Sequence, residues 1–457
     1  MWPFKFFNNG GTRKGPPPLK VNDKTIVAPA TASGRGGISI IRMSGKRSKK
    51  IAQTMCGELP EPWHFKKTKI KSSDANVLDS GMVVFFESPH SYTGDDVVEF
   101  HCHGNPVVVS LIIEEAVRLG AVVAEPGEFT KIAFLNDKID LAQAESVADL
   151  ISAQSKSAVV AANSSLSGDF SKEINLLLDG IVTARVLVEA SIDFPEDELD
   201  EGLLFEIHEN LITQSKGIRS ILENVKEGVK LRDGYSVAIV GPPNAGKSTL
   251  LNTLAKENIA ITSEIPGTTR DLVRAQVDVG GVLIEFVDTA GVRPDPENTV
   301  EREGINRSQE VIRKSNLCLL VQDVANQKDF DVELGNFISV MNKSDLLFEQ
   351  TPNKGDLVYL SCTTGSGIKE LLKAIQSKLG IDEGVETAFL SRKRHEICLK
   401  EGRTLIEDSI VSLSEGRSLE LVAESLRSAH QVLGEILRPM TADDLLGEIF
   451  SEFCIGK

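Results

Sequence analysis

The sequence predicts a multidomain protein of mixed α+β and α/β class, in which a P-loop domain with a mostly parallel sheet and helices on both faces interrupts an all-helical domain. Three observations support this fold. Residues 25–120 alternate short β-branched runs with glycine-rich turns, apolar residues recur at helical spacing on both sides of residues 235–380, and a strand leads into a glycine-rich loop and a helix near residue 241. A chain of 457 residues has room for about three domains.

The expected order of domains follows from these changes of pattern. We expect a flexible extension over 1–24, an α+β domain over 25–140, the first part of a helical domain over 141–234, the P-loop domain over 235–380 and the second helical part over 381–457. The extension combines a Pro16-Pro17-Pro18 run with Gly10-Gly11, which disfavours regular structure.

Neither helical part has enough apolar surface to fold alone. We therefore expect the two parts to pack together as one discontinuous domain, with the P-loop domain inserted at a loop. In the first part the residues that recur at helical spacing are Ile174, Leu178, Ile181, Val182, Arg185, Val188 and Glu189, and in the second part an apolar stripe comprises Val422, Leu426, Ala429, Leu433 and Ile436.

Composition excludes several classes of protein. The net charge of −16 excludes a generalised basic coat for nucleic acid or anionic lipid, although a local basic patch is compatible with it. Six scattered cysteines without a CxxC pair suit a reducing compartment. We find no apolar run near the roughly 20 residues of a membrane span and no apolar core of a secretory signal, so we expect a cytoplasmic protein without a membrane partner.

The strongest motif runs from Gly241 to Ser248 and reads GPPNAGKS, which fits GxxxxGK[ST]. It follows a β-branched strand and precedes a helix, as a P-loop requires. The backbone N–H groups of such a loop face phosphates, Lys247 neutralises the β- and γ-phosphate oxygens, and the Ser248 hydroxyl binds Mg²⁺.

The other nucleotide-binding elements follow in the expected order. Thr268 and Thr269 lie in a GTTRD segment that can supply the hydroxyl that senses Mg²⁺ and the γ-phosphate. Asp288 begins a DTAG motif that would hold Mg²⁺ through water. Asp345 ends an NKSD motif, and its carboxylate can accept hydrogen bonds from guanine N1–H and N2–H₂, donors that adenine lacks there. We therefore expect GTP rather than ATP.

The complete expected GTP-binding set joins these motifs with the loop that buttresses the base. It comprises Asn244, Ala245, Gly246, Lys247, Ser248, Thr249, Ser263, Glu264, Ile265, Pro266, Gly267, Thr268, Thr269, Asp288, Thr289, Ala290, Gly291, Asn342, Lys343, Asp345, Ser361, Cys362 and Thr363. Ser248 and Thr269 are the expected Mg²⁺ ligands, and Lys247 and Thr269 are expected to act in catalysis.

Hydrolysis cannot follow the scheme of small signalling GTPases, which place a water-orienting glutamine directly after the DxxG glycine. Val292 occupies that position here. Another group must position the water, and another cation must offset the charge that an arginine finger would neutralise. Arg293 and Glu301 lie in the segment that follows.

Several short motifs together resemble the TrmE/MnmE family of tRNA modification GTPases. Besides Asn244 and Val292, the similarity includes 34-GRGG-37, 91-SYTGDD-96, 126-PGEF-129, 133-AFLNDK-138, 443-DDLLG-447 and the C-terminal 453-FCIGK-457. It extends from about Thr25 to Lys457, and the extension over 1–24 lies outside it. Two positions depart from the family pattern, because Ile132 stands where arginine is common and Pro242 replaces the usual arginine of the P-loop.

The resemblance implies an activity beyond nucleotide binding. Members act with a FAD-dependent partner protein to install 5-carboxymethylaminomethyl, or aminomethyl, groups on the wobble uridine of tRNA. The G domains of a homodimer meet across the nucleotides, and K⁺ takes the place of the arginine finger. The residues that match the K⁺ ligands are Asn244, Ser263, Ile265 and Thr268, and Glu301 matches the glutamate that orients water.

The resemblance also implies a tetrahydrofolate site in the N-terminal domain, which would supply the one-carbon unit as 5,10-methylene- or 5-formyl-tetrahydrofolate. The matching residues are Arg42, Glu99, Lys138 and the terminal Lys457. Cys454 is either a thiol near the folate or a buried or tail thiol without a role. Arg293, in the segment that follows the DxxG motif, is a further possible site residue.

Two functions remain in competition. The first is the RNA-modifying enzyme, and the second is a GTP-gated ribosome- or RNA-binding switch without folate chemistry. Folate should bind to the first and not to the second. The basic runs Lys46–Lys50 and Arg392–His395 are candidate contacts to tRNA phosphates, although such runs are more often solvated faces.

Overall fold

The structure is a computed structural model. It describes residues 24–193, 201–257, 273–288, 311–326, 335–347, 355–381, 389–439, 447, 449–451, 453 and 455–457. The chain divides into two compact units, the first formed by 1–148 and 437–457 and the second by 149–436. Within the described ranges, no helix combines the length and the apolar character needed to cross a membrane.

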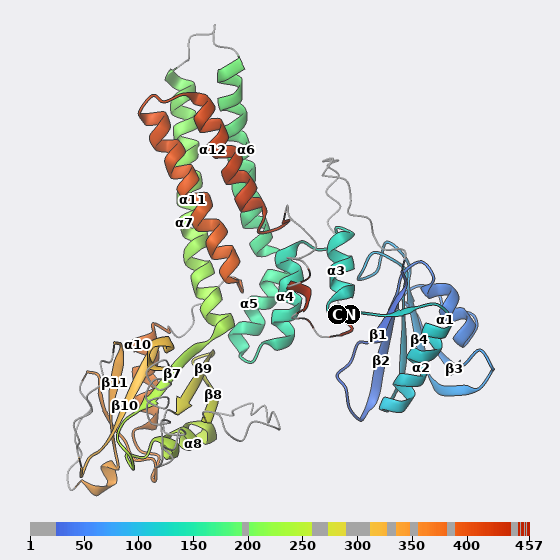
Figure 1. The fold of residues 1–457 in the computed structure, drawn as a ribbon, viewed down its shortest axis with the longest axis horizontal. Helices are drawn as coiled ribbons and strands as arrows, with labels where there is room; N and C mark the ends of the chain where they lie inside the picture. The colour runs from blue at the N-terminus through green and yellow to red at the C-terminus, as the bar shows by residue number, and fades with distance from the viewer. Residues whose placement is uncertain are drawn as a thin grey trace, which may run out of the picture. The chain divides into compact units, whose positions relative to one another are not determined.

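The first unit contains a six-stranded sheet in the order β3–β4–β5–β2–β1–β6. The strands are β1 (Ile26–Pro29), β2 (Gly36–Ser44), β3 (Phe65–Lys71), β4 (Val77–Phe86), β5 (Val97–Gly104) and β6 (Val122–Val123). Neighbouring strands are antiparallel except for β1 and β6, which are parallel. Helices α1 (Ser48–Cys56) and α2 (Pro106–Arg118) pack on the sheet through a buried apolar cluster that includes Ile41, Phe100 and Ile112 (Figure 1).

The C-terminus of the chain completes this unit. Ile449, Phe450 and Phe453 pack on the start of helix α4 (Leu141–Ser152), and Phe450 also approaches Gly127, which precedes α3 (Glu128–Leu135). The backbone N–H of Phe129 donates to the carbonyl of Lys457 at 3.1 Å. The last residue of the sequence is thus held against α3, about 330 residues away along the chain.

The second unit contains the helical domain and the P-loop domain. The helices are α5 (Lys156–Ser167), α6 (Asp169–Asp193), α7 (Glu201–Asp233), α11 (Lys393–Ser414) and α12 (Leu419–Gly434). The four longest lie side by side, with two from each side of the inserted domain (Figure 1). The discontinuous helical fold predicted from the two apolar stripes is therefore confirmed.

The stripes differ in detail from the prediction. Val422, Leu426, Ala429, Leu433 and Ile436 are all buried, although α12 ends at Gly434. In α6 the buried line runs through Leu177 and Ala184, which the predicted stripe omitted, whereas Glu189 is exposed. Residues three or four positions apart lie on the same face of a helix, and the predicted set included residues that lie outside the buried face.

The P-loop domain has a six-stranded sheet in the order β12–β11–β10–β7–β9–β8. Its strands are β7 (Tyr235–Val240), β8 (Val273–Val279), β9 (Val282–Asp288), β10 (Leu317–Asp323), β11 (Phe337–Asn342) and β12 (Leu357–Tyr359), with helices α8 (Lys247–Glu257) and α10 (Ile368–Leu379). Only the β8–β9 pair among these is antiparallel, so the predicted mostly parallel sheet is confirmed. The carboxyl ends of the parallel strands therefore meet at one edge, where ligands of such sheets bind.

Candidate functional site

The phosphate-binding loop joins β7 to α8, and its backbone requires glycine at two positions. Gly241 and Gly246 have φ angles of 143° and 95°. A Cβ atom on Gly241 would lie 2.1 Å from the carbonyl oxygen of Val321, and one on Gly246 would lie 2.1 Å from Nδ2 of Asn342. At these two positions the backbone has a conformation that residues other than glycine rarely adopt, and the loop packs closely against β10 and the NKSD motif.

Lys247 opens α8 and folds back over this loop. Its ammonium donates to the carbonyl oxygens of Gly241, at 2.8 Å, and Pro242, at 2.9 Å. Burial lowers the pKa of Lys247, and the negative charge of Asp288 opposes that shift. The contact with residue 242 uses its backbone carbonyl, so proline in place of the family's usual arginine preserves it.

Ser248 and Asp288 come together from separate motifs. The Ser248 hydroxyl donates to Oδ2 of Asp288 at 2.7 Å, and Asp288 is buried at the carboxyl end of β9. A hydroxyl and a carboxylate at one point are the hard oxygen donors that Mg²⁺ prefers, with one or two protein ligands and the rest from water and phosphate. The pair fits a magnesium site beside the phosphate loop.

Asn342 connects three segments that are far apart in the sequence. Its Nδ2 donates to the carbonyl of Ala245 at 2.9 Å, and its Oδ1 accepts from the backbone N–H groups of Lys343, at 2.8 Å, and Cys362, at 3.3 Å. This buried amide holds the phosphate loop, the NKSD motif and the loop at Ser361–Thr363 in one arrangement.

The two loops expected to bind the base carry an exposed carboxylate, Asp345, next to side chains that are held by other contacts. Asp345 lies in the short turn Ser344–Leu346 and is exposed. Lys343 has a φ of 65°, and its ammonium forms an ion pair with Asp323 at 2.6 Å. Burial raises the pKa of the Cys362 thiol to about 11, so that side chain is neutral at pH 7.

Asp323 was missed in the sequence analysis. It ends β10, directly beside Asn342 at the end of β11. The signal was available, because a carboxylate at the carboxyl end of a predicted parallel strand lies at the ligand-binding edge of the sheet. No nucleotide-binding motif includes that position.

Several predicted residues lie outside the described part of the chain. They are Ser263, Glu264, Ile265, Pro266, Gly267, Thr268, Thr269, Thr289, Ala290, Gly291, Arg293, Glu301 and Cys454. The structure brings together those that it describes, from Asn244 to Ser248 with Asp288, Asn342, Lys343 and Ser361–Cys362.

A second polar cluster lies on the sheet of the first unit. Arg42 on β2 is paired in register with Glu99 on β5, and its Nε donates to Oε1 of Glu99 at 2.8 Å. The Arg42 guanidinium also lies 5.4 Å from the ring centre of Tyr92 and 5.9 Å from that of Phe129. Two aromatic rings therefore lie beside the guanidinium of an arginine–carboxylate pair on this face.

The charge state of this cluster is set by its surroundings. Burial alone would raise the pKa of Glu99, but hydrogen bonds from His101 and Arg42 and the positive charge of Arg42 bring it below its ordinary value. Burial raises the pKa of Tyr92, whose hydroxyl contacts that of Thr130 at 2.8 Å. At neutral pH the face therefore offers a carboxylate acceptor between neutral aromatic rings.

The two lysines predicted for the same site each contact a segment that carries one of the two aromatic rings. Lys457 reaches the cluster through its carbonyl, which accepts from Phe129. Gly456 has a φ of 93°, and a Cβ there would lie 1.9 Å from the carbonyl of Pro29. Lys138 donates to the carbonyl of Pro89 at 3.0 Å and packs against Gly94, in the loop that carries Tyr92.

The basic run Arg392–His395 does not form a continuous solvated patch, because Lys393 is its only exposed residue. Arg392 and His395 are buried, and Arg394 donates to the carbonyls of Glu435 and Ile436 at the end of α12. The prediction was wrong for these residues because a run of basic letters does not reveal buried partners for the charge.

Comparison with known protein families decides between the remaining classes of GTPase. A family model described as the N-terminus of the GTP-binding protein TrmE matches residues 25–138, and one described as the MnmE helical domain matches residues 141–454, more than half of the chain. The chain belongs to the TrmE/MnmE family of tRNA modification GTPases.

Curated members of the TrmE/MnmE family match almost end to end. The tRNA modification GTPase MnmE of Neisseria gonorrhoeae (strain NCCP11945) is 43% identical over 448 residues, which cover 95% of this chain and 99% of the relative. The MnmE of Legionella pneumophila (strain Paris) is 43% identical over 447 residues, with the same coverage. Among solved structures, the G domain of the T. maritima FeoB iron transporter matches 32% of this chain and 98% of its own at 21% identity, with a TM-score of 0.24 that is too low for a comparison of folds.

Proposed function

We propose that this chain is a K⁺-activated GTPase that, with a FAD-dependent partner, forms 5-carboxymethylaminomethyl or aminomethyl uridine at the wobble position of tRNA, using a one-carbon unit from tetrahydrofolate. The observation that carries this proposal is the Arg42–Glu99 cluster between Tyr92 and Phe129, closed by the C-terminal Lys457. These residues offer charged and aromatic groups that could hold a folate, which a switch GTPase without folate chemistry would not bind.

The nucleotide site supports GTP and Mg²⁺ as ligands of the second unit. Lys247 would neutralise the β- and γ-phosphates, Ser248 would bind Mg²⁺ directly, and Asp288 would hold one of its waters. The support comes from the 2.7 Å contact of Ser248 with Asp288 and from the position of Lys247 over the loop. Asp345 would select guanine, and Thr269 would sense the γ-phosphate.

The proposed hydrolysis uses a bound cation instead of an arginine finger. Asn244, with Ser263, Ile265 and Thr268, would bind K⁺, and Glu301 would orient the attacking water in place of the glutamine absent at Val292. Asn244 supports this role because it lies in the phosphate loop, with a backbone φ of 65°, and is exposed, so that its side-chain oxygen is accessible to a cation. A cation there would offset the charge that develops on the phosphates.

We expect GTP turnover to fall at least about tenfold when KCl is replaced by NaCl, since an arginine finger in the same role is worth a factor of about 1,000 or more. Steady-state phosphate release measured at constant ionic strength tests this, because general screening stays fixed while the specific ion changes. Equal rates in both salts would contradict the K⁺ site. A variant with Asn244→Ala provides the matched control, since it should be slow in both salts.

The N-terminal cluster has the chemistry to hold a folate. The ionised Glu99 can accept from the amino and ring N–H groups of a pterin, and Tyr92 and Phe129 can flank its plane. Lys138 and Lys457 would contribute charge for the anionic tail. The folate supplies the one-carbon unit when bound, and this chain's residues orient it and keep Glu99 ionised.

A homodimer is proposed from the open face of the same sheet. Ile38 is 63%, Phe65 58% and Met82 40% exposed. Phe65 and Met82 lie on the face that carries Glu99, opposite the face covered by α1 and α2. A second copy would cover this apolar surface. With tRNA and the FAD-dependent protein as further partners, we place the enzyme in the cytoplasm.

A further inference from the structure

The chain passes twice between the helical domain and the P-loop domain, and the two connections lie side by side. The first runs from the end of α7 through Leu231 to Tyr235 and into β7, and the second runs from Phe389 to Arg392 and into α11. A Cβ on Gly228 would lie 2.5 Å from the carbonyl of Phe389. The contact is therefore too close for any side chain at residue 228.

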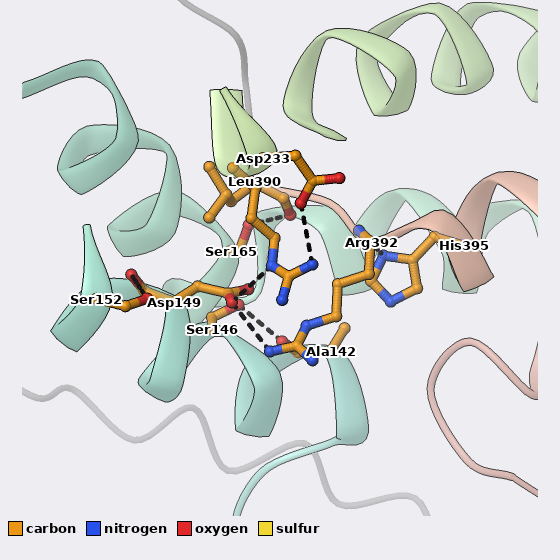
Figure 2. A network of polar contacts seen from close by, with 10 residues as sticks. Ala142, Ser146, Asp149, Ser152, Ser165, Asp233, Leu390, Arg392 and His395 are labelled. Carbon is orange, nitrogen blue, oxygen red and sulfur yellow. Dashed lines mark hydrogen bonds and ion pairs between the residues drawn. The ribbon is translucent and has the colours of Figure 1, made fainter. Parts of the chain in front are cut away.

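Asp149 on α4 binds both connections through a single oxygen atom. Its Oδ1 accepts from Nε of Arg232 at 3.0 Å and from Nη2 of Arg392 at 2.9 Å. Figure 2 shows the carboxylate of Asp149 facing the guanidinium of Arg392. The side chains of Asp149 and Arg392 are 6% and 10% exposed, whereas that of Arg232 is 30% exposed.

The second connection has further anchors in the helical domain. The Leu390 N–H donates to the carbonyl of Ala161 at 3.2 Å, and the Leu390 carbonyl accepts from the hydroxyl of Ser165 at 3.0 Å. The Phe389 ring packs on that of Phe170 with centres 4.7 Å apart. This connection is therefore part of the helical domain's packing, and Asp149 joins the first connection to it.

The electrostatics require the carboxylate. Two guanidinium groups within 3.0 Å of one oxygen repel each other, and in a poorly solvated site that repulsion is stronger than in water. Asp149 is the anion that allows Arg232 and Arg392 to approach. Without it the repulsion between the two guanidinium groups would loosen the contact between the connections, although Gly228 still packs on Phe389. A displacement of the P-loop domain would then be passed less completely from one connection to the other.

We propose that Asp149 is a positioning residue that couples the nucleotide state of the P-loop domain to the helical domain, by holding the incoming and outgoing connections together so that they move as one. The consequence for tRNA modification rests on the function proposed above. The mechanical coupling itself does not, and the two can be tested separately.

The decisive experiment is hydrogen–deuterium exchange of the full-length chain, compared between GDP and a non-hydrolysable GTP analogue. In the unmodified protein we expect the analogue to change exchange in the phosphate loop and also in α5 and α11. With Asp149→Asn, we expect the change in the phosphate loop to remain and the change in α5 and α11 to fall at least about threefold, a loss of coupling within the range seen for altered allosteric networks. An unaltered response of α5 and α11 would overturn the proposal, as would an unmodified protein whose helices do not respond.

The control removes a carboxylate elsewhere in the helical domain that also pairs with two arginines but is more exposed, at 40%. Glu407 on α11 forms ion pairs with Arg219 and Arg403 through one oxygen, at 3.5 Å each, and touches neither connection. Glu407→Gln should leave the response of the helices intact. If it reduces that response as much as Asp149→Asn does, the effect is a general loss of charge and the proposal is wrong.

A double variant separates coupling from stability. Asp149→Asn leaves Arg392 buried without its carboxylate, which destabilises a protein irrespective of coupling. Combining Asp149→Leu with Arg392→Met replaces the buried pair by apolar groups and should restore the melting temperature. We expect the response of α5 and α11 to remain weak. Its recovery would show that Asp149 only neutralises Arg392.

The complete modification reaction provides the second measurement. With Asp149→Asn, we expect GTP hydrolysis within about twofold of normal and at least a fivefold fall in modified uridine formed per GTP, the lower end of usual coupling factors. An unchanged yield per GTP would contradict a role in coupling. If the unmodified enzyme forms no modified uridine, the proposed function fails, and the exchange experiment alone decides on Asp149.

Discussion

Replacing Asp345 with asparagine is expected to lower the affinity for GTP by about 1,000-fold, because a site built to accept hydrogen bonds rejects a ligand whose donors it can no longer meet. The carboxylate would accept from N1–H and N2–H₂ of guanine, and the asparagine amide would point its own N–H groups at one of those donors. The frame around Asp345 should persist, since Asn342 holds the neighbouring loops independently through the carbonyl of Ala245 and the N–H of Cys362.

Xanthosine triphosphate sharpens this prediction. It carries an oxygen where guanine has the amino group, so it can accept from the asparagine amide, and its affinity for Asp345→Asn should exceed that of GTP. Titration with fluorescent nucleotide analogues measures both affinities. Asp356→Asn is the matched control, because Asp356 pairs with Lys378 at 2.5 Å and belongs to no nucleotide-binding motif. An unchanged preference for GTP in Asp345→Asn would show that another group reads the base.

Replacing Lys247 with alanine is expected to reduce GTP hydrolysis by about 100-fold or more, the usual cost of removing a preorganised group from a developing charge. The Lys247 ammonium is already fixed over the phosphate loop by the carbonyls of Gly241 and Pro242. It therefore needs little reorganisation when the γ-phosphate departs.

Phosphate release under saturating GTP measures this loss, and titration with labelled nucleotide reports the accompanying loss of affinity. Lys256→Ala on the same helix is the control, because Lys256 is exposed at the far end of α8. Lys256→Ala should behave as the unmodified protein. Hydrolysis at a normal rate in Lys247→Ala would contradict the proposed phosphate site.

The nucleotide-binding loops were the most predictable part of this molecule. Their motifs fix residue type because the backbone geometry demands it, as at Gly241 and Gly246, where a Cβ would collide with the neighbouring strand or with Asn342. The parallel sheet followed from strands that each lead into such a loop. The nucleotide-binding motifs and the order of the strands therefore predict the same P-loop domain.

Long-range contacts were less predictable. Nothing in a single sequence placed Asp149 beside Arg232 and Arg392, which are 83 and 243 residues away from it. The basic run at Arg392 looked solvated because local composition does not reveal a distant carboxylate. Asp323 differs, because its place at the carboxyl end of a parallel strand was predictable, and only its pairing with Lys343 depends on the adjacency of β10 and β11.

The N-terminal cluster was less predictable than the nucleotide-binding loops and more predictable than the contacts of Asp149. The family resemblance proposed Arg42, Glu99, Lys138 and Lys457 as one site, and residue spacing alone offered no reason to group them. The sheet pairs Arg42 with Glu99, and the C-terminal residues return to α3. Whether this cluster binds a folate decides between the modification enzyme and a plain switch.

The most direct measurement supplies 5,10-methylene-tetrahydrofolate with a ¹³C-labelled methylene group to the complete reaction of this chain, the FAD-dependent partner, tRNA and GTP, and analyses the tRNA nucleosides by mass spectrometry. We expect a modified wobble uridine that carries the label, forms only with GTP, and is lost in Arg42→Ala while GTP hydrolysis persists. Modified uridine without the label, or labelled product undiminished by Arg42→Ala, would contradict this expectation.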